Sequence, residues 1–255
     1  MADHVEVKRE GPVLGIRLRR PERRNALTVA MYAVLAEAVG SAADDPAIRL
    51  ITISGEGPDF TAGNDLMDFL QEARPDAIEE LPVGRFLHAL ADNEIPLIAA
   101  VQGNAIGIGT TLLLHCDLVI ADAGARFKLP FVELGLVPEA ASSLLLPRLA
   151  GRRAAARMLL LGETFGAEEA LQWGIASHVV PAGRLEAALE ETVARLLARP
   201  PEALRLTQRL LRSADRDEVK KRIGIEGGHF SERLQSDEIK QAIASFFAAR
   251  SGNTA

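Results

Sequence analysis

The sequence predicts an α/β fold, and three observations support this prediction. Runs of buried, strand-like residues alternate with helical segments in the first half of the chain, a pattern typical of a parallel sheet covered by helices. The 255 residues are 48% hydrophobic and 25% charged, as in an ordinary globular protein. This length suits one large α/β domain, alone or with a helical appendage.

The N-terminal elements follow from local patterns. A Glu10-Gly11-Pro12 turn between two short apolar runs predicts a hairpin. Thr28 precedes a helix-periodic stretch and is a suitable N-cap, and Asp65 can cap a later helix. The expected elements are, in order, strands at 5–9 and 13–17, a helix at 29–43, a buried strand at 48–54, a loop at 55–63 and a helix at 78–93.

The middle of the chain continues the alternation, and the C-terminal half is expected to be almost entirely helical from 140 to 250. We therefore expect a core of residues 1–200 and a C-terminal helical segment, 201–255, packed on the core or on a neighbouring subunit. The expected elements are a buried strand at 97–101, a glycine turn at 103–109, a buried helix at 110–115 and a strand at 118–121.

Charge and cysteine content narrow the function classes. The 29 lysines and arginines against 35 acids give a net charge of −6, which argues against general nucleic-acid binding. The single cysteine, Cys116, rules out an intrachain disulfide framework, and the five dispersed histidines do not predict a metal site. Cys116 and His115 are interpreted as core residues.

The targeting and membrane signals are weak. The N-terminus lacks an apolar signal core, so a cytoplasmic location is the default expectation. Residues 95–116 contain no Asp, Glu, Lys or Arg, but Pro96 and several glycines interrupt this stretch. In lipid, such a helix would leave backbone groups unsatisfied, so a membrane span is not predicted.

Two glycine-rich turns carry the main chemical prediction. Each follows a buried strand and precedes a helix, at residues 60–66 and 103–111. Two such turns that converge can hold one oxygen atom between backbone N–H groups, which makes an oxyanion hole. The alternative is two simple close-packed turns. A dinucleotide motif is disfavoured, because its third glycine would fall at Leu112.

Two carboxylates lie in apolar sequence, Glu133 and Glu139. Glu139 follows Pro138 and precedes a mostly apolar helix. It could simply complement the positive end of that helix. It could instead be a buried carboxyl group whose pKa is raised toward neutrality and which moves protons. From the residues alone, the first interpretation is favoured.

Four segments together resemble the crotonase superfamily, also known as the enoyl-CoA hydratase/isomerase superfamily. Any one is modest support, but all four occur in the family's order over nearly the full chain. These segments are Arg20-Pro21-Glu22-Arg23-Arg24-Asn25-Ala26-Leu27, Phe60-Thr61-Ala62-Gly63-Asn64-Asp65-Leu66, Val101-Gln102-Gly103-Asn104-Ala105-Ile106-Gly107-Ile108-Gly109 and Phe230-Ser231-Glu232-Arg233-Leu234-Gln235-Ser236-Asp237-Glu238.

The resemblance implies a spiral of ββα units with a C-terminal helical trimerisation region, and a homotrimer or a dimer of trimers. It implies acyl-CoA thioester substrates, with the thioester oxygen held by the N–H groups of Ala62 and Ile108. No cofactor is expected, because CoA is part of the substrate. The implied substrate-binding residues are Arg24, Ala62, Gly63, Asn64, Asp65, Leu66, Gly107, Ile108, Thr111 and Phe131.

The position of the acid suggests the reaction. Hydratases of the superfamily carry two glutamates where this chain has Thr111 and Phe131. Glu139 instead matches the single base of Δ3-Δ2-enoyl-CoA isomerases of the peroxisomal type, and ring-opening isomerases of phenylacetate catabolism have an aspartate there. The resemblance therefore implies isomerisation of 3-enoyl-CoA to trans-2-enoyl-CoA by Glu139.

Three alternatives stay open. One is an enoyl-CoA hydratase, a lyase of fatty-acid or aromatic-acid degradation, in which Glu139 and Glu133 move the protons. The others are a ring-opening phenylacetate-type isomerase and a non-catalytic acyl-CoA-binding member. The loop at 69–82 is expected to border the acyl pocket. Candidate partners of the CoA phosphates are Arg23 and Arg24, the group Arg148, Arg152, Arg153 and Arg157, and the group Arg205, Arg209 and Arg212.

Overall fold

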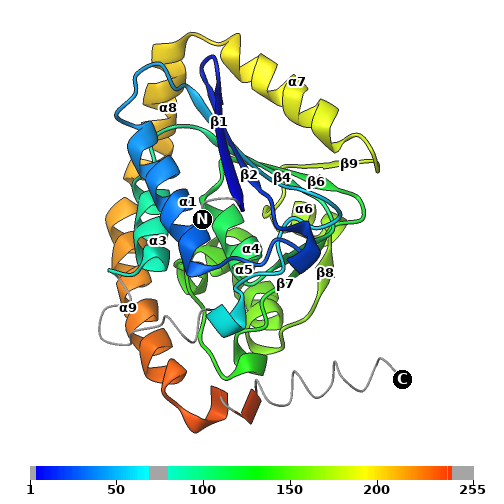
Figure 1. Cartoon of the computed structure of the whole chain (residues 1–255), viewed down its shortest axis with the longest axis vertical. Coiled ribbons are helices and arrows are strands. Elements are labelled where there is room, and N and C mark those ends of the chain that lie inside the picture. The colour runs from blue at the N-terminus through cyan, green and yellow to red at the C-terminus, as the bar shows by residue number, and fades with distance from the viewer. Residues whose placement is uncertain (1–3, 69–79, 240, 243–255) are drawn as a thin grey trace.

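The computed structural model describes residues 4–68, 80–239 and 241–242, and the chain folds around two β-sheets (Figure 1). The large sheet has the strand order β1-β2-β3-β4-β6-β9, with β1 and β2 antiparallel and the other pairs parallel. Its strands are β1 Val5–Glu10, β2 Val13–Leu18, β3 Leu50–Gly55, β4 Leu97–Val101, β6 Leu118–Asp122 and β9 His178–Val180.

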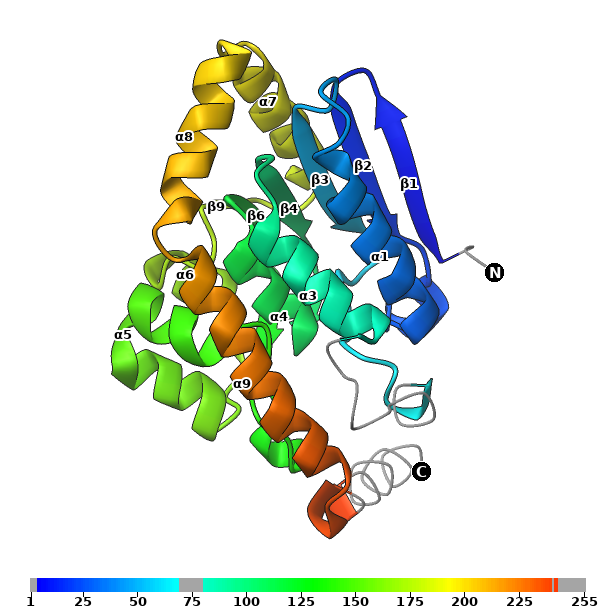
Figure 2. The ribbon, with the colours of Figure 1, turned by 90° about the vertical axis from the view of Figure 1, so that its left-hand side faces the viewer.

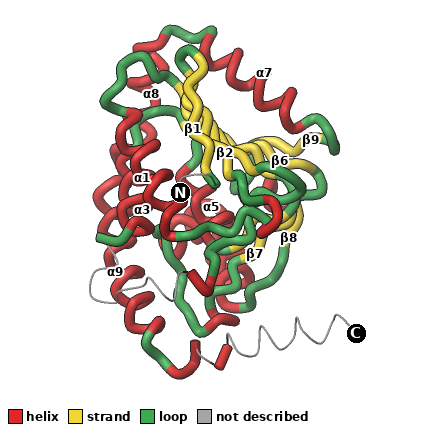
Figure 3. The backbone as a smooth tube through the Cα atoms, viewed as in Figure 1, coloured by secondary structure: helices red, strands yellow, loops and turns green. Residues whose placement is uncertain are grey.

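The small sheet has the order β5-β7-β8 and lies apart from the large one, as the yellow segments in Figure 3 show. Its strands are β5 Asn104–Ile106, β7 Arg126–Lys128 and β8 Phe165–Gly166. The helices are η1 Pro21–Arg23, α1 Val29–Ala42, α3 Pro82–Asp92, α4 Ile108–Thr111, η3 Leu112–His115, η4 Val132–Leu134, α5 Ser142–Leu160, α6 Ala167–Gln172, α7 Leu185–Leu197, α8 Pro201–Ser213 and α9 Arg216–Leu234.

The chain passes repeatedly from the large sheet to the small sheet and then into a helix. One unit runs from β4 through β5 to α4, and the next runs from β6 through β7 toward α5. The preceding unit leaves β3, touches the small sheet through the Thr61–Ala105 bridge, and becomes helical at Leu66. The predicted α/β spiral of ββα units is therefore confirmed.

Helices α1 and α3 lie side by side against the large sheet (Figure 2). The buried face of α1 carries Tyr32 and Leu35, and the Tyr32 ring lies 5.8 Å from that of Phe86 on α3. The Thr28 hydroxyl accepts the N–H of Met31 at 3.2 Å, so Thr28 is the N-cap that the sequence predicts. This packing places α1 between α3 and the strands β1 and β2.

Several element predictions need correction. The expected helix at 110–115 begins at Ile108 and tightens into η3, and β5 precedes it, because Asn104–Ile106 pairs in register with β7. The region 140–250 is not uniformly helical, because β8 and β9 are two- and three-residue strands, too short for a periodic signal. The helix expected at 78–93 begins at Pro82, and residues 78 and 79 lie outside the described residues.

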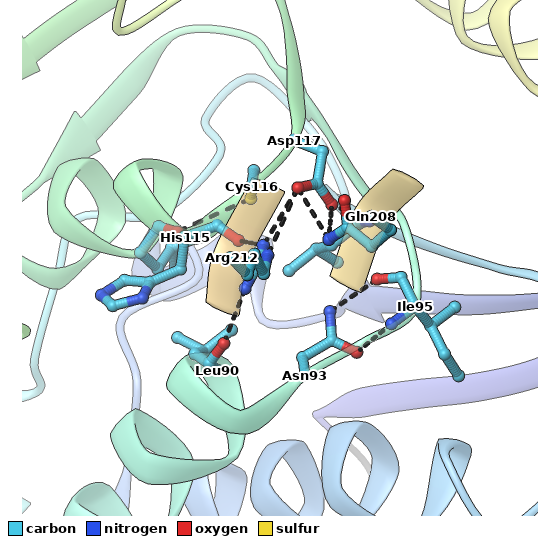
Figure 4. A network of polar contacts seen from close by, with 10 residues as sticks. Leu90, Asn93, Ile95, His115, Cys116, Asp117, Gln208 and Arg212 are labelled. Carbon is cyan, nitrogen blue, oxygen red and sulfur yellow. Dashed lines mark hydrogen bonds and ion pairs between the residues drawn. The ribbon is translucent and has the colours of Figure 1, made fainter. Parts of the chain in front are cut away.

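The first part of the predicted C-terminal segment is tied to the core through Asp117 (Figure 4). The Asp117 carboxylate accepts the Leu97 N–H at 2.8 Å and the Gln208 amide on α8 at 2.8 Å. The Arg212 guanidinium pairs with Asp117 and donates to the carbonyls of Leu90, at 2.9 Å, and His115. Residues 240 and 243–255 of this segment lie outside the described residues, and its division from the core at residue 200 stays a prediction.

No helix in the described part of the chain combines the length and the apolar character that crossing a bilayer requires.

Candidate functional site

The two glycine-rich turns meet at Thr61. The Thr61 N–H donates to the Asn104 carbonyl at 2.9 Å, and the Thr61 carbonyl accepts the Ile106 N–H at 3.0 Å. These bonds make the first turn a neighbour of β5, so the parallel strand order brings together two segments that are about 40 residues apart. The two turns are therefore neighbours in the fold, which an oxyanion hole built from both of them requires.

Glycine is required at two points of this contact. Gly63 has φ +88°, and a Cβ atom there would lie 2.7 Å from the Ile106 carbonyl oxygen. A Cβ atom on Gly109 would lie 2.5 Å from Cγ2 of Thr61. Side chains at either position would push the turns apart, so these glycines set the distance between the two segments.

We expect Gly63→Ala to lower the free energy of unfolding by about 3 kcal/mol, since it adds a backbone clash to an unfavourable φ. Gly183→Ala is the matched control: Gly183 has φ +77° and nothing within 4 Å of its would-be Cβ, so about 1 kcal/mol is expected. Urea unfolding followed by circular dichroism measures both. Equal losses would contradict the close-approach explanation.

A cavity of about 910 Å³ opens beside the meeting point of the turns. All predicted substrate-binding residues line it except Thr111. Its lining residues are Glu22, Arg23, Arg24, Ala26, Ala62, Gly63, Asn64, Asp65, Leu66, Met67, Ile106, Gly107, Ile108, Lys128, Pro130, Phe131, Glu133, Leu134, Leu136, Phe230 and Ala242. Of the expected border at 69–82, residues 69–79 lie outside the described residues.

The N–H group of Ala62 is already in use, which corrects the prediction that it faces a substrate oxygen. It donates to the Arg24 carbonyl at 2.9 Å. Arg24 and Asn25 both have left-handed backbones, with φ of 51° and 53°, and this turn directs the carbonyl toward Ala62. The neighbouring Gly63 N–H donates to the Thr61 hydroxyl at 3.1 Å.

Two other cavity-lining N–H groups are better placed. Within residues 4–68, 80–239 and 241–242, the backbone N–H groups of Asn64 and Ile108 have no hydrogen-bond acceptor. Asn64 comes directly after Gly63, and Ile108 is the first residue of α4. The pair Asn64 and Ile108 can therefore receive an oxygen atom without breaking an existing bond.

Tyr32 fixes the side chain of Asn64. Its hydroxyl group donates a short hydrogen bond to Oδ1 of Asn64, and the tyrosine itself is completely buried. Burial, followed by the nearby charge of Glu139, raises the pKa of Tyr32 well above its usual range, so its proton stays on. The sequence analysis did not select Tyr32. The one feature that could have drawn attention to it is that it is the chain's single tyrosine and lies on the apolar face of a helix.

Glu139 is buried and hydrogen-bonded to Thr111. The Thr111 hydroxyl donates to Oε1 of Glu139 at 2.5 Å, and Glu139 is only 9% exposed. Burial raises the pKa of Glu139 to about 8; the Thr111 hydrogen bond lowers it, and the charge of Glu226 raises it. Because α5 begins at Ser142, Glu139 lies ahead of that helix and does not occupy its first turn.

Glu139 and Thr111 come close in sequence to two segments of the cavity lining. Neither residue lines the cavity, but Ile108, three positions before Thr111, and Leu136, three positions before Glu139, both do. The hydrogen-bonded pair therefore follows two lining segments along the chain.

The turn that follows Glu139 is strained and held by several side chains. Ala140 and Ala141 both have φ of 57°, a conformation that costs roughly 1–2 kcal/mol per residue. The Ser142 hydroxyl donates to the Glu139 carbonyl at 2.6 Å. His115 contacts the Ala140 carbonyl through Nε2 at 2.8 Å, and burial lowers the pKa of this histidine to about 4, so it is a neutral donor. The interpretation of His115 as a core histidine is confirmed.

The surroundings of Cys116, which follows His115, make its thiol a poor nucleophile. Burial raises the pKa of the Cys116 thiol, and the charge of Asp117 adds to this effect. The thiol contacts the Leu112 carbonyl at 3.6 Å. Its interpretation as a core residue is therefore supported by its environment.

Charged groups gather at the cavity mouth. Lys128 pairs with Glu133 at 2.8 Å, and Asp65 pairs with Arg20 at 2.8 Å. The Arg24 side chain is 61% exposed and only loosely paired, at 3.8 Å from Asp59. Arg24 can therefore turn toward an anionic ligand. Lys128 also lines the cavity, and sequence reasoning missed it.

The other basic groups lie elsewhere. None of the two predicted arginine groups lines the described cavity. Their members make other contacts: Arg148 with Asp215 and Glu218, Arg157 with Glu163 and Trp173, Arg205 with Glu202, Arg209 with Glu94, and Arg212 with Asp117. These five arginines therefore have structural partners away from the described cavity.

Comparison with known proteins gives a consistent picture. A family model described as enoyl-CoA hydratase/isomerase matches residues 8–253. The chain is 34% identical to the 1,2-epoxyphenylacetyl-CoA isomerase of Escherichia coli (strain K12), over 95% of this chain and 94% of that protein. It is 33% identical to the 2,3-dehydroadipyl-CoA hydratase of the same organism, over 96% and 95% of the two chains.

A further relative and a solved structure extend the comparison. The chain is 32% identical to enoyl-CoA delta isomerase 2 of Rattus norvegicus, over 95% of this chain and 63% of that longer protein. A crystal structure of an enoyl-CoA hydratase/isomerase from Pseudoalteromonas atlantica T6c superposes with a TM-score of 0.91 at 39% identity, covering 96% of this chain and 97% of that one. Relatives with isomerase and hydratase names are equally similar, so similarity alone does not separate the reactions.

Proposed function

Since the chain belongs to the enoyl-CoA hydratase/isomerase family, we propose that it is an acyl-CoA enzyme that converts 3-enoyl-CoA esters into trans-2-enoyl-CoA esters. The observation that carries this proposal is Glu139: a buried carboxyl group whose pKa lies near 8 and whose partner is the Thr111 hydroxyl. Such a group can take up and return a proton near neutral pH.

The proposed reaction needs one carboxylate and two backbone donors. Ionised Glu139 removes a proton from C2, and the C–H bonding electrons form a dienolate whose negative charge rests on the thioester oxygen. The N–H groups of Asn64 and Ile108 stabilise that charge. Glu139, now protonated, returns the proton to C4, so the double bond moves to C2–C3 and the atoms are conserved.

Hydration is disfavoured by the surroundings of the remaining acids. Phe131 and Thr111 occupy the positions where hydratases are expected to have glutamates, and neither can activate water at neutral pH. Glu133 lines the cavity, but it is exposed and paired with Lys128. The proposal therefore assigns all proton transfer to Glu139.

A panel of 2-enoyl and 3-enoyl CoA esters tests this function. Isomerisation conserves the mass of the ester and hydration adds one water, so mass spectrometry separates the two outcomes. We expect 3-enoyl esters to react without a mass change. Efficient hydration of trans-2-enoyl-CoA would refute the isomerase proposal.

Ring opening is the second candidate, since a relative at 34% identity is named 1,2-epoxyphenylacetyl-CoA isomerase. The same site could serve it, because that reaction also needs a proton acceptor near an oxyanion hole. Including epoxyphenylacetyl-CoA in the panel decides between the two: preferred turnover of this ester would favour ring opening over double-bond migration.

We expect Thr111→Val to move the acidic limb of the pH profile of kcat/KM to higher pH, by about one unit. The Thr111 hydrogen bond lowers the pKa of Glu139, and valine removes this donor while keeping the side-chain shape. Thr111→Ser keeps the hydroxyl and is the control. An unchanged profile in Thr111→Val would show that Glu139 is not the group that titrates.

Assembly into a trimer, or a dimer of trimers, is part of the proposal. Large apolar side chains on two helices face outward in the single chain, as expected for a surface that another subunit covers. They include Leu149 and Leu160 of α5, and Leu206 and Leu210 of α8. Light scattering coupled to size-exclusion chromatography would measure the assembly's mass.

A further inference from the structure

Helix α9 buries a second acid beside the turn that carries Glu139. Glu226 is 5% exposed, and its Oε1 accepts the N–H of Ser143 at 2.9 Å. Ser143 is the second residue of α5 and stands four positions after Glu139. Glu226 therefore holds the far end of the strained turn through Ala140 and Ala141, whereas Thr111 bonds to Glu139 at its start.

Only half of the Glu226 carboxyl group is used by this contact. Its Oε2 is buried and has no hydrogen-bond partner within the described residues. Leaving a buried carboxylate oxygen unpaired is unfavourable, and a glutamine could accept the same N–H without a charge. The Ser143 N–H therefore satisfies one of the two oxygens of this carboxyl group.

The charge of Glu226 acts on Glu139. Burial raises the pKa of Glu226, and hydrogen bonding to Ser143 and to the backbone of Ala141 lowers it. Its negative charge in turn raises the pKa of Glu139, in addition to the larger effect of burial. Two carboxyl groups in one poorly solvated region resist being ionised together, so their protonation is coupled.

The other charged and titratable groups around this turn come from three elements. Arg222, also on α9, donates to the Ser143 hydroxyl at 3.4 Å, and its charge lowers the pKa of Glu226. Tyr32 on α1 and His115 on η3 are buried and neutral. Glu226 is thus the anion that acts on Glu139 from the C-terminal helices.

We propose that Glu226 is a positioning residue for Glu139: its buried carboxyl group anchors the Glu139–Ser143 turn through the Ser143 N–H, and it places a second acid beside that turn before substrate binds. This inference rests on the proposed role of Glu139 as the base. It makes α9, through Glu226, part of the machinery that prepares the site, although Glu226 does not line the cavity.

The first test is the pH profile of kcat/KM for 3-enoyl-CoA in Glu226→Gln. Glutamine keeps an oxygen acceptor for Ser143 but removes the charge, so the acidic limb is expected to shift by about one unit toward acid. Glu226→Asp keeps the charge and is expected to retain the wild-type midpoint, even if its shorter side chain lowers kcat. The control Glu190→Gln removes an exposed acid on α7 and should leave the profile unchanged.

The second test does not depend on turnover. Side-chain carboxyl NMR of the ¹³C-labelled wild-type protein is expected to show a Glu139 resonance that titrates in two coupled steps, assigned by its loss in Glu139→Gln. In Glu226→Gln, that resonance should titrate in one step, at lower pH. If Glu139 titrates in one step in the wild-type protein, or at the same pH in Glu226→Gln, the proposal is overturned.

The two tests also separate this inference from the proposed function. If the carboxyl groups are coupled but Glu139→Gln remains active, the proposed role of Glu139 as base fails, and only the electrostatic part of the inference survives. If Glu139→Gln is inactive and the groups titrate independently, the proposed function stands and the role of Glu226 is refuted.

Discussion

Replacing Glu139 by glutamine is expected to reduce kcat for 3-enoyl-CoA by a factor of about 10²–10⁴, with a much smaller change in KM. Glutamine has nearly the same size and can still accept the Thr111 hydroxyl bond, but it cannot remove a proton. The measurement is the initial rate of isomerisation at a pH above 8, where the wild-type carboxyl group is mostly ionised. Turnover near the wild-type rate would exclude Glu139 as the base.

The same variant has a stability signature that does not depend on substrate. The pKa of Glu139 is about 8 in the folded chain against an ordinary value of 4.5, so the unfolded state loses its proton first. Stability from this group is therefore fully present below pH 4.5 and is lost as the pH rises to about 8. Glutamine does not titrate. The free energy of unfolding of Glu139→Gln should therefore increase relative to that of the wild type as the pH rises across this window, by on the order of 5 kcal/mol.

This signature is also the control for misfolding. Urea unfolding of both proteins at pH 5 and pH 8 measures the difference between them, and the sign matters more than the size. A variant that is inactive yet gains relative stability at pH 8 has lost a buried titrating acid and not its fold. A difference that does not vary with pH would mean that Glu139 is solvated in solution.

The second large effect is expected when proline replaces Ile108. Proline lacks the backbone N–H, so this substitution removes one of the two proposed donors to the thioester oxygen, and a 10²–10³-fold loss of kcat is expected. Ile108 is the first residue of α4, the position in a helix that tolerates proline. KM should change little, because the donor matters most when charge develops on the oxygen.

Ile108→Val is the matched control for that experiment. It keeps the N–H and a β-branched side chain, so it should retain most of the activity. Thermal unfolding of both variants checks that the turn has survived. If proline and valine variants turn over at similar rates, the Ile108 N–H does not serve the reaction.

In the first glycine turn, the hydrogen bonds of the structure distinguish Asn64 from Ala62 as the proposed donor to the thioester oxygen. The Ala62 N–H is bonded to the Arg24 carbonyl, whereas the Asn64 N–H has no acceptor among the residues that the structure describes and its side chain is held by Tyr32. The motif alone could not distinguish these neighbours, because each presents one N–H and they are two positions apart. Their difference arises from the left-handed turn at Arg24 and Asn25, which lies some 40 residues earlier in the chain.

Local signals were sufficient for the elements that depend on local energetics. Thr28 capping, the β-branched run of β3 and the uninterrupted apolar run of β4 each determine a conformation through a few neighbouring residues. The short strands β8 and β9 exist only because a partner strand lies beside them, so no window of sequence could reveal them.

The α/β fold, the two glycine turns and the candidate acid at position 139 could be predicted from the sequence alone. They could be predicted because alternating apolar runs, glycine-rich turns and a carboxyl group among apolar residues are visible in a few neighbouring positions. The folded chain was needed to show that the Ala62 N–H is bonded to Arg24, that Thr111 donates to Glu139, and that Glu226 holds the Ser143 N–H. The contacts of Thr111 and Glu226 join residues 28 and 83 positions apart, and pKa values depend on burial and distance in space, which a linear pattern does not contain.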